Sequence, residues 1–205
     1  ILTWLHNGNY GTLLQAYALQ SFLKGEGYEV SNIDFKPSTI EKVKNLIKCH
    51  NSLSLIREKF DGYLSRKQGE PELLSKRDLA FEQFMNQNIN LTKQYSKADT
   101  LTDLSGKYDA YLCGSDQIWS PMLLNPVYYF NFLSENERRY AYACSFGVSE
   151  IPTKKKEIIQ NYLEKFSEIS VRENTGAKIV NALIGKNVPI NVDPTLLLEP
   201  EKWNE

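Results

Sequence analysis

The sequence has few of the residues on which disulfide-rich and metal-binding proteins depend. Its 205 residues include only two histidines and three cysteines, and the cysteines are Cys49, Cys113 and Cys144. Their spacing is not that of metal ligands, so we expect no metal site. An odd number of widely spaced cysteines, two of them in apolar runs, favours free thiols in a reducing compartment. We therefore predict a cytoplasmic protein.

The chain also lacks an excess of charge of one sign and lacks long apolar runs. It has 24 Lys and Arg against 25 Asp and Glu, which leaves a formal net charge of -1. Nucleic-acid-binding proteins are usually strongly basic, so we expect no nucleic-acid partner. No run approaches the roughly 18 apolar residues that span a bilayer, which predicts no integral membrane segment. The aromatic content of 12% is too high for a disordered chain.

Strand-like and helix-like patterns alternate along most of the sequence. Strands are predicted at 1–5, 28–35, 108–113, 140–146, 169–171 and 189–192. Helical patterns fall at 12–24, 79–88, 154–166 and 174–184. This alternation predicts an α/β fold with a doubly wound, mostly parallel, Rossmann-like sheet.

The pattern also suggests a division of the chain. We assign residues 1–193 to a Rossmann-like N-terminal domain, interrupted by a helical excursion at 36–88. The chain begins without Met and ends soon after an apolar run, so residues 194–205 are expected to start a C-terminal domain that is missing here.

Ligands of open parallel sheets bind outside the carboxyl ends of the strands, and the first such end holds a polar turn. His6 precedes Asn7, Gly8, Asn9, Tyr10 and Gly11, which lead into the first helix. The helix N-terminus can receive an anion, but the turn has neither a G-x-G-x-x-G nor a Walker pattern, so a purely structural turn stays equally open. His6 is a candidate acid or anion contact, or a residue that only hydrogen-bonds the loop.

The most informative strand end follows residues 108–113. Ser115, Asp116 and Gln117 place a hydroxyl, a carboxylate and an amide there, and Trp119 follows. We expect Asp116 to orient or deprotonate a hydroxyl nucleophile and Trp119 to stack on a sugar face. The alternative is an Asx-type turn at Asp116 with Trp119 in the core.

Two later strand ends carry Ser145 and the pair Arg172 and Glu173. Arg172 can clamp a carboxylate or phosphate, or can form a local ion pair with Glu173 or Asp193. The candidate catalytic residues are therefore Asp116 and His6. The candidate substrate-binding residues are Asn7, Gly8, Asn9, Tyr10, Gly11, Ser115, Gln117, Trp119, Ser145, Arg172 and Glu173.

Five segments together resemble the polysaccharide pyruvyl transferase family. They are residues 9–20, 108–119 with Gly114-Ser115-Asp116-Gln117, 140–147, 170–173 and 193–197, in this order. The resemblance spans nearly the whole chain except 36–78. The roles of Asp116 and Arg172 rest on their strand-end positions and not on a motif of the family.

The resemblance implies the N-terminal half of a GT-B-like two-domain architecture. It implies transfer of the enolpyruvyl unit of phosphoenolpyruvate to two hydroxyls of a surface-glycan sugar, which forms a pyruvate ketal and requires no further cofactor. The acceptor would be a glycan or a lipid-linked sugar, reached from the cytoplasm at the inner face of the membrane. Donor-holding residues of the family lie largely in the C-terminal half, so we expect these 205 residues alone to be inactive. The alternatives are a nucleotide-sugar-dependent GT-B glycosyltransferase and a non-catalytic glycan-binding domain.

Overall fold

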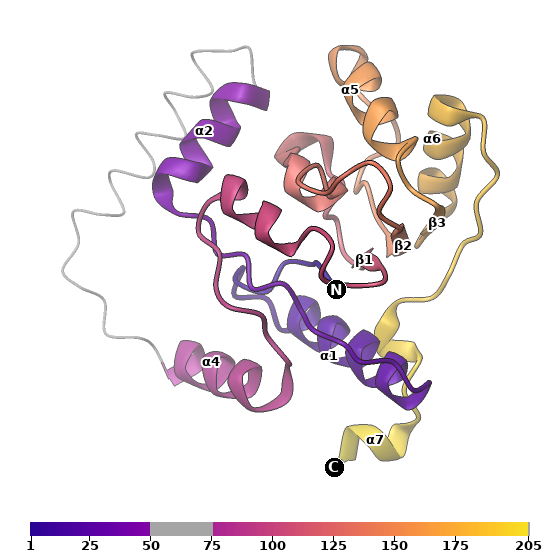
Figure 1. Cartoon of the computed structure of the whole chain (residues 1–205). Coiled ribbons are helices and arrows are strands. Elements are labelled where there is room, and N and C mark those ends of the chain that lie inside the picture. The colour runs from indigo at the N-terminus through magenta and orange to yellow at the C-terminus, as the bar shows by residue number, and fades with distance from the viewer. Residues whose placement is uncertain (50–75, 205) are drawn as a thin grey trace.

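The computed structural model describes residues 1–49 and 76–204 (Figure 1). The strands are β1 (Tyr111–Gly114), β2 (Arg139–Cys144) and β3 (Glu168–Val171). The α-helices are α1 (Tyr10–Gly25), α2 (Thr39–Cys49), α4 (Lys76–Asn88), α5 (Thr153–Leu163), α6 (Asn174–Ile184) and α7 (Pro200–Asn204). Four 3-10 helices are η1 (Ala98–Leu104), η2 (Pro121–Leu123), η3 (Pro126–Tyr129) and η4 (Pro194–Leu196).

The strands form a parallel sheet in the order β1-β2-β3, and bridges extend it on both sides. Leu2 pairs with Cys113 of β1, and Ile190 pairs with Val171 of β3. The segment 31–36 hydrogen-bonds to Ile1 and, on its other side, to 90–95. The order across the sheet is therefore 90–95, 31–36, 1–2, β1, β2, β3, 189–191. Numbered along the chain this order is 3-2-1-4-5-6-7, which is the strand order of Rossmann folds.

The predicted α/β fold with a parallel sheet is thus confirmed, but three predicted strands are reduced to bridges. Residues 1–5, 28–35 and 189–192 pair through only one or two positions each. One cause is visible at Asp34, whose N–H donates to Oγ1 of Thr92 at 3.1 Å instead of to a backbone carbonyl. A side chain that takes the place of a carbonyl interrupts the ladder.

The helices cover both sides of the sheet. Figure 1 shows α5 and α6 side by side, with α1 on the other side of the strands. α1 is buried at seven positions between Thr12 and Gln20 and packs with α4 around a small core of Leu5, Leu13, Ala16, Phe81, Met85 and Ile89. α1 also packs against η4, and the rings of Tyr17 and Trp203 lie 5.8 Å apart. Residues 194–204 therefore rest on this helix.

The helical excursion is described only in part. Its two ends are the helices α2 and α4, while residues 50–75 lie outside the described residues. The division of the chain into domains stays a prediction.

The crossover from β1 to β2 differs from a standard Rossmann unit. Residues 115–138, all of them described, contain η2 and η3 but no α-helix. Aromatic side chains replace the helix as the cover of the sheet: Trp119 stacks on Tyr129 at 5.5 Å, and Tyr129 stacks on Tyr162 of α5 at 5.0 Å. Because aromatic rings bury large apolar areas, this cluster can stabilise the sheet as a crossover helix would.

Candidate active site at the strand ends

The strand order reverses between residues 1–2 and β1, and this is where ligands of doubly wound sheets bind. Two loops meet at that point through Thr12, whose hydroxyl donates to Oδ2 of Asp116 at 2.6 Å. The amide of Asn7 in turn donates to Oγ1 of Thr12 at 3.1 Å. The structure therefore joins the two predicted loops, 6–11 and 115–117, around one carboxylate.

Asp116 is held by its surroundings on both sides. Its Oδ1 accepts the N–H of Gln117 at 2.8 Å, and its carbonyl accepts the N–H of Ser145 at 3.0 Å. The residue has a φ of 76°, a left-handed conformation that Asp tolerates better than most residues. It stays partly exposed, and each carboxylate oxygen has a further lone pair for a ligand hydroxyl.

The turn before α1 is exposed at this edge, as predicted. Asn9 caps the helix, since its Oδ1 accepts the N–H of Gly11 at 2.8 Å, and Oδ1 of Asn7 accepts the N–H of Asn9 at 3.1 Å. Arg77 of α4 donates to the carbonyl of Gly8 at 2.6 Å and lies 5.3 Å from the ring centre of Tyr10. The turn is therefore shaped by its own asparagines, which also use one of the N–H groups that an anion would need.

His6 has a partner that the sequence analysis missed. Its Nε2 lies 2.5 Å from Oδ1 of Asp34, and Gln94 donates to the other oxygen of that carboxylate at 3.2 Å. The two side chains are only 14% and 9% exposed. When Nε2 carries the proton toward Asp34, Nδ1 is the ring atom that can exchange a proton with a ligand. Asp34 is a polar residue near the end of a predicted strand, so the rule that selected Asp116 could have selected it too.

A second group of side chains follows β2 and β3. The hydroxyl of Ser145 donates to Oε1 of Glu173 at 2.8 Å. Arg172 donates to Oδ2 of Asp193 at 3.1 Å and lies 3.9 Å from a carboxylate oxygen of Glu173. The ion-pair alternative for Arg172 is the arrangement seen, and an anionic ligand would have to compete with these carboxylates for the guanidinium.

Three residues predicted to contact a ligand have buried side chains in this structure. Trp119 is fully buried between aromatic rings, and its Nε1 donates to the carbonyl of Tyr128 at 3.2 Å, so neither face is open to a sugar. Ser115 is also fully buried and donates to the carbonyl of Ala143 at 2.8 Å. Ser145 is 2% exposed. For Trp119 the core alternative is confirmed, and Gln117 remains as the exposed neighbour of Asp116.

Carboxylates dominate the described part of this edge. The basic side chains there each have a partner: His6 lies against Asp34, Arg77 donates to the Gly8 carbonyl, and Arg172 pairs with Asp193. A row of carboxylates repels anions and accepts hydrogen bonds from hydroxyls, so this edge suits a neutral polyol better than an anionic ligand. The carboxylates are Asp34, Asp116, Glu173 and Asp193.

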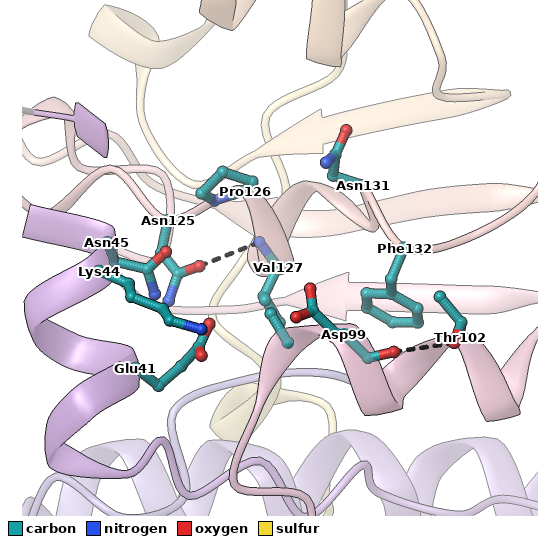
Figure 2. A pocket seen from close by; sticks show the side chains of 11 residues that line it. Glu41, Lys44, Asn45, Asp99, Thr102, Asn125, Pro126, Val127, Asn131 and Phe132 are labelled. Atoms are coloured by element: carbon teal, nitrogen blue, oxygen red, sulfur yellow. Dashed lines mark hydrogen bonds between the residues drawn. The ribbon is translucent and has the colours of Figure 1, made fainter. Parts of the chain in front are cut away.

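One pocket formed by the described residues lies away from the strand ends. That pocket has a volume of about 350 Å³ and lies between α2, η1 and η3, with none of the predicted site residues in its lining (Figure 2). Within residues 1–49 and 76–204 no group of three or more His, Cys, Asp or Glu side chains is placed to hold a metal ion. None of the described helices combines the length and apolar character needed to cross a membrane.

The comparison with protein families identifies the family of the chain. The family model described as "Polysaccharide pyruvyl transferase" matches residues 9–205. The chain belongs to the polysaccharide pyruvyl transferase family. Searches of curated proteins and of solved structures find no match. Membership in this transferase family agrees with a sheet edge whose exposed side chains suit a sugar.

Proposed function

We propose that this chain provides the acceptor-binding half of a polysaccharide pyruvyl transferase. The enzyme moves the enolpyruvyl unit of phosphoenolpyruvate to two hydroxyls of a glycan sugar, on a lipid-linked or free acceptor in the cytoplasm. The match to the family over residues 9–205 is the observation that carries this proposal. The carboxylate-rich strand ends support the acceptor role, because they accept hydrogen bonds from hydroxyls.

The reaction balances with two proton transfers. One sugar hydroxyl adds to the central carbon of phosphoenolpyruvate, and the methylene carbon takes up a proton and becomes a methyl group. The second hydroxyl then forms the other carbon–oxygen bond of the ketal as phosphate leaves. The proton of this second hydroxyl goes to the solvent or to the departing phosphate. The step needs a base at a sugar hydroxyl and an acid at the methylene carbon.

Asp116 is our candidate base and His6 our candidate acid. Asp116 is fixed by Thr12 and by the Gln117 N–H, and a carboxylate fixed in this way can take a proton from a hydroxyl aligned with a free lone pair. Asp34 orients His6 and leaves Nδ1 for the proton transfer. The exposed Asn7 and Gln117 and the partly exposed Glu173 would position the sugar through their side-chain amide and carboxylate groups.

Phosphoenolpyruvate is an anion and needs cationic partners, but the basic side chains at this edge already have partners. We therefore place the carboxylate and phosphate of phosphoenolpyruvate on a second, C-terminal Rossmann-like half, in a GT-B-like arrangement. On this proposal the 205-residue chain alone releases no phosphate.

The test is phosphate release from phosphoenolpyruvate, measured for this chain and for the chain joined to the proposed second half. Acceptors containing galactose, mannose or N-acetylmannosamine are supplied in turn. Release that requires an acceptor, together with a new methyl signal of the ketal in the NMR spectrum, supports the proposal. Absence of release with every acceptor, combined with thermal stabilisation by a nucleotide sugar, would overturn it in favour of glycosyl transfer.

Two matched variants test whether Asp116 is the base. Asp116→Asn keeps the size of the side chain and, in the chain joined to the proposed second half, is expected to lower kcat about 10²- to 10⁴-fold, the range typical of a lost general base. Asp109→Asn alters an exposed carboxylate just before β1 and should leave kcat unchanged. Equal kcat values for the two variants would show that Asp116 is not the base.

A further inference from the structure

The pocket between α2, η1 and η3 is lined largely by polar side chains that are not part of the candidate site at the strand ends. Figure 2 shows Glu41, Lys44 and Asn45 on α2 across from Asp99, Asn131 and Phe132. Its volume of about 350 Å³ falls in the range of small-molecule sites. We propose that this pocket binds one neutral sugar unit of a glycan, with the carboxylate of Glu41 as the main acceptor of its hydroxyl hydrogen bonds.

Glu41 is the strongest reason to expect a ligand. The residue is only 6% exposed, yet among the described residues its carboxylate has no hydrogen bond or ion pair. Neither oxygen is among the buried polar atoms without a partner, so both reach the open volume of the pocket, where water or a ligand can donate to them. A ligand hydroxyl in the pocket would supply the missing donors.

A structural role as a helix cap does not account for this carboxylate. Ser38 and Glu41 have the spacing of a capping box, and Oγ of Ser38 accepts the N–H of Glu41 at 3.2 Å. In a complete box the Glu side chain would bind the Ser38 N–H. That N–H instead donates to the carbonyl of Ser96 at 2.9 Å. The Ser38 N–H is therefore not available to Glu41, and the Glu41 side chain lines the pocket instead.

The remaining lining has the chemistry of a polyol site. Asn45 and Asn131 each offer two donors and an acceptor, and Asn125 keeps its Nδ2 donors because only its Oδ1 is used, by the N–H of Val127 at 3.0 Å. Phe132 is partly buried and supplies an aromatic surface for the C–H face of a sugar ring. Alternating donors, acceptors and an apolar surface match the groups of a pyranose.

Other ligand classes fit less well. The pocket lining has the two carboxylates of Glu41 and Asp99 against the single ammonium group of Lys44, and this excess of negative charge opposes an anion such as phosphoenolpyruvate. No set of three metal-ligating side chains is found in the described parts of the chain, the pocket included. The identification of the ligand as a piece of the acceptor glycan rests on the proposed function, whereas the presence of a sugar site does not.

The test is a titration of the ¹⁵N-labelled chain with methyl β-galactoside, methyl α-mannoside and N-acetylmannosamine, followed by NMR. We expect at least one sugar to shift the amide signals around Asn45 and Asn131. Glucuronate should bind at least tenfold more weakly than the best neutral sugar. Equal binding of glucuronate, or the absence of shifts at the pocket with all three sugars, would overturn the proposal.

Variants assign the binding to Glu41. Glu41→Gln keeps the shape and removes the charged acceptor, so the dissociation constant should rise at least tenfold. Glu157→Gln, at an exposed carboxylate of α5, is the control and should bind as the original chain does. If Glu41→Gln does not fold, Asn131→Ala on the exposed rim and Phe132→Leu should each weaken binding severalfold, and unchanged affinity in both would contradict the site.

The outcome is separate from that of the transfer assay. Sugar binding at the pocket without acceptor-dependent phosphate release would leave the pocket as a glycan site and reject the proposed transfer. Acceptor-dependent phosphate release without sugar binding at the pocket would support the proposed transfer and reject the pocket as a glycan site.

Discussion

At Gly114 the end of β1 passes so close to β2 that a side chain would overlap the neighbouring backbone. A Cβ built at this position would lie 2.1 Å from the carbonyl oxygen of Tyr142, and the φ of 150° is one that L-residues rarely adopt. Gly114→Ala should therefore lower the free energy of unfolding by at least about 3 kcal/mol, measured by chemical denaturation.

Gly25 is the matched control for that substitution. It is the last residue of α1, its φ is ordinary, and a Cβ there would meet no atom within 4 Å. Because alanine is the better helix former, Gly25→Ala should raise the stability by up to about 1 kcal/mol. A similar loss in both variants would mean that the approach of β1 to β2 is not what constrains Gly114.

Single residues also show how far the sequence could predict the site. Asp116 was found because it is polar and follows a buried strand, and the structure places it where the strand order reverses. Trp119 takes the core alternative, which the sequence left open because it does not reveal on which side of a turn an indole lies. The pairing of His6 with Asp34 joins residues 28 positions apart, and only the order of the strands brings them together.

Among the elements, α1 is joined to the loop after β1 by the hydrogen bond from Thr12 to Asp116. Thr12→Val keeps the shape of the side chain but leaves Asp116 without one donor and Asn7 without its acceptor. A hydrogen bond to a charged group contributes about 1.5–3 kcal/mol, so we expect a loss of that size in the free energy of unfolding. Thr153→Val, at an exposed position of α5, should change it by less than about 0.5 kcal/mol.

A double-mutant cycle separates this contact from other effects of the substitution. If Thr12 acts through Asp116, then combining Thr12→Val with Asp116→Ala, which removes the acceptor, should cost about 1–2 kcal/mol less than the sum of the single losses. Strictly additive losses would show that the hydroxyl stabilises α1 by another route.

The elements themselves were predictable where their pattern is regular. The helices α1, α4, α5 and α6 follow apolar stripes of helical period, and the structure has them close to the predicted bounds. The crossover at 115–138 was not predicted as an aromatic layer, because Tyr128, Tyr129 and Phe130 are adjacent and have no period. The Glu41 pocket was also missed, since its lining comes from three separate segments.

For the whole molecule, the two cysteines in the middle of the sheet report on global opening. Cys113 and Cys144 are fully buried on neighbouring strands, with their sulfur atoms 3.5 Å apart. Burial raises the pKa of the Cys144 thiol well above its usual value, and the hydrogen bond with Cys113 raises it further. Both thiols should therefore be unreactive in the folded chain.

The measurement is labelling with a thiol-specific disulfide reagent at pH 8 in a Cys49→Ser background. Labelling of both remaining cysteines should follow the loss of the circular dichroism signal as denaturant is added, because only global unfolding exposes the sheet centre. Complete labelling in denaturant is the positive control. Rapid reaction of either thiol without denaturant would show that the sheet opens locally.

The position of Leu2 has a consequence for synthesis of the chain. Leu2 is fully buried in the middle of the sheet, and its neighbour on one side is Cys113, more than a hundred residues later. Ribosomes add about 5–20 residues per second, so the first apolar segment waits roughly 5 to 20 s for that neighbour. During this time the nascent chain exposes a strand edge that the finished protein hides, which makes it a natural client for chaperones that bind at the ribosome exit.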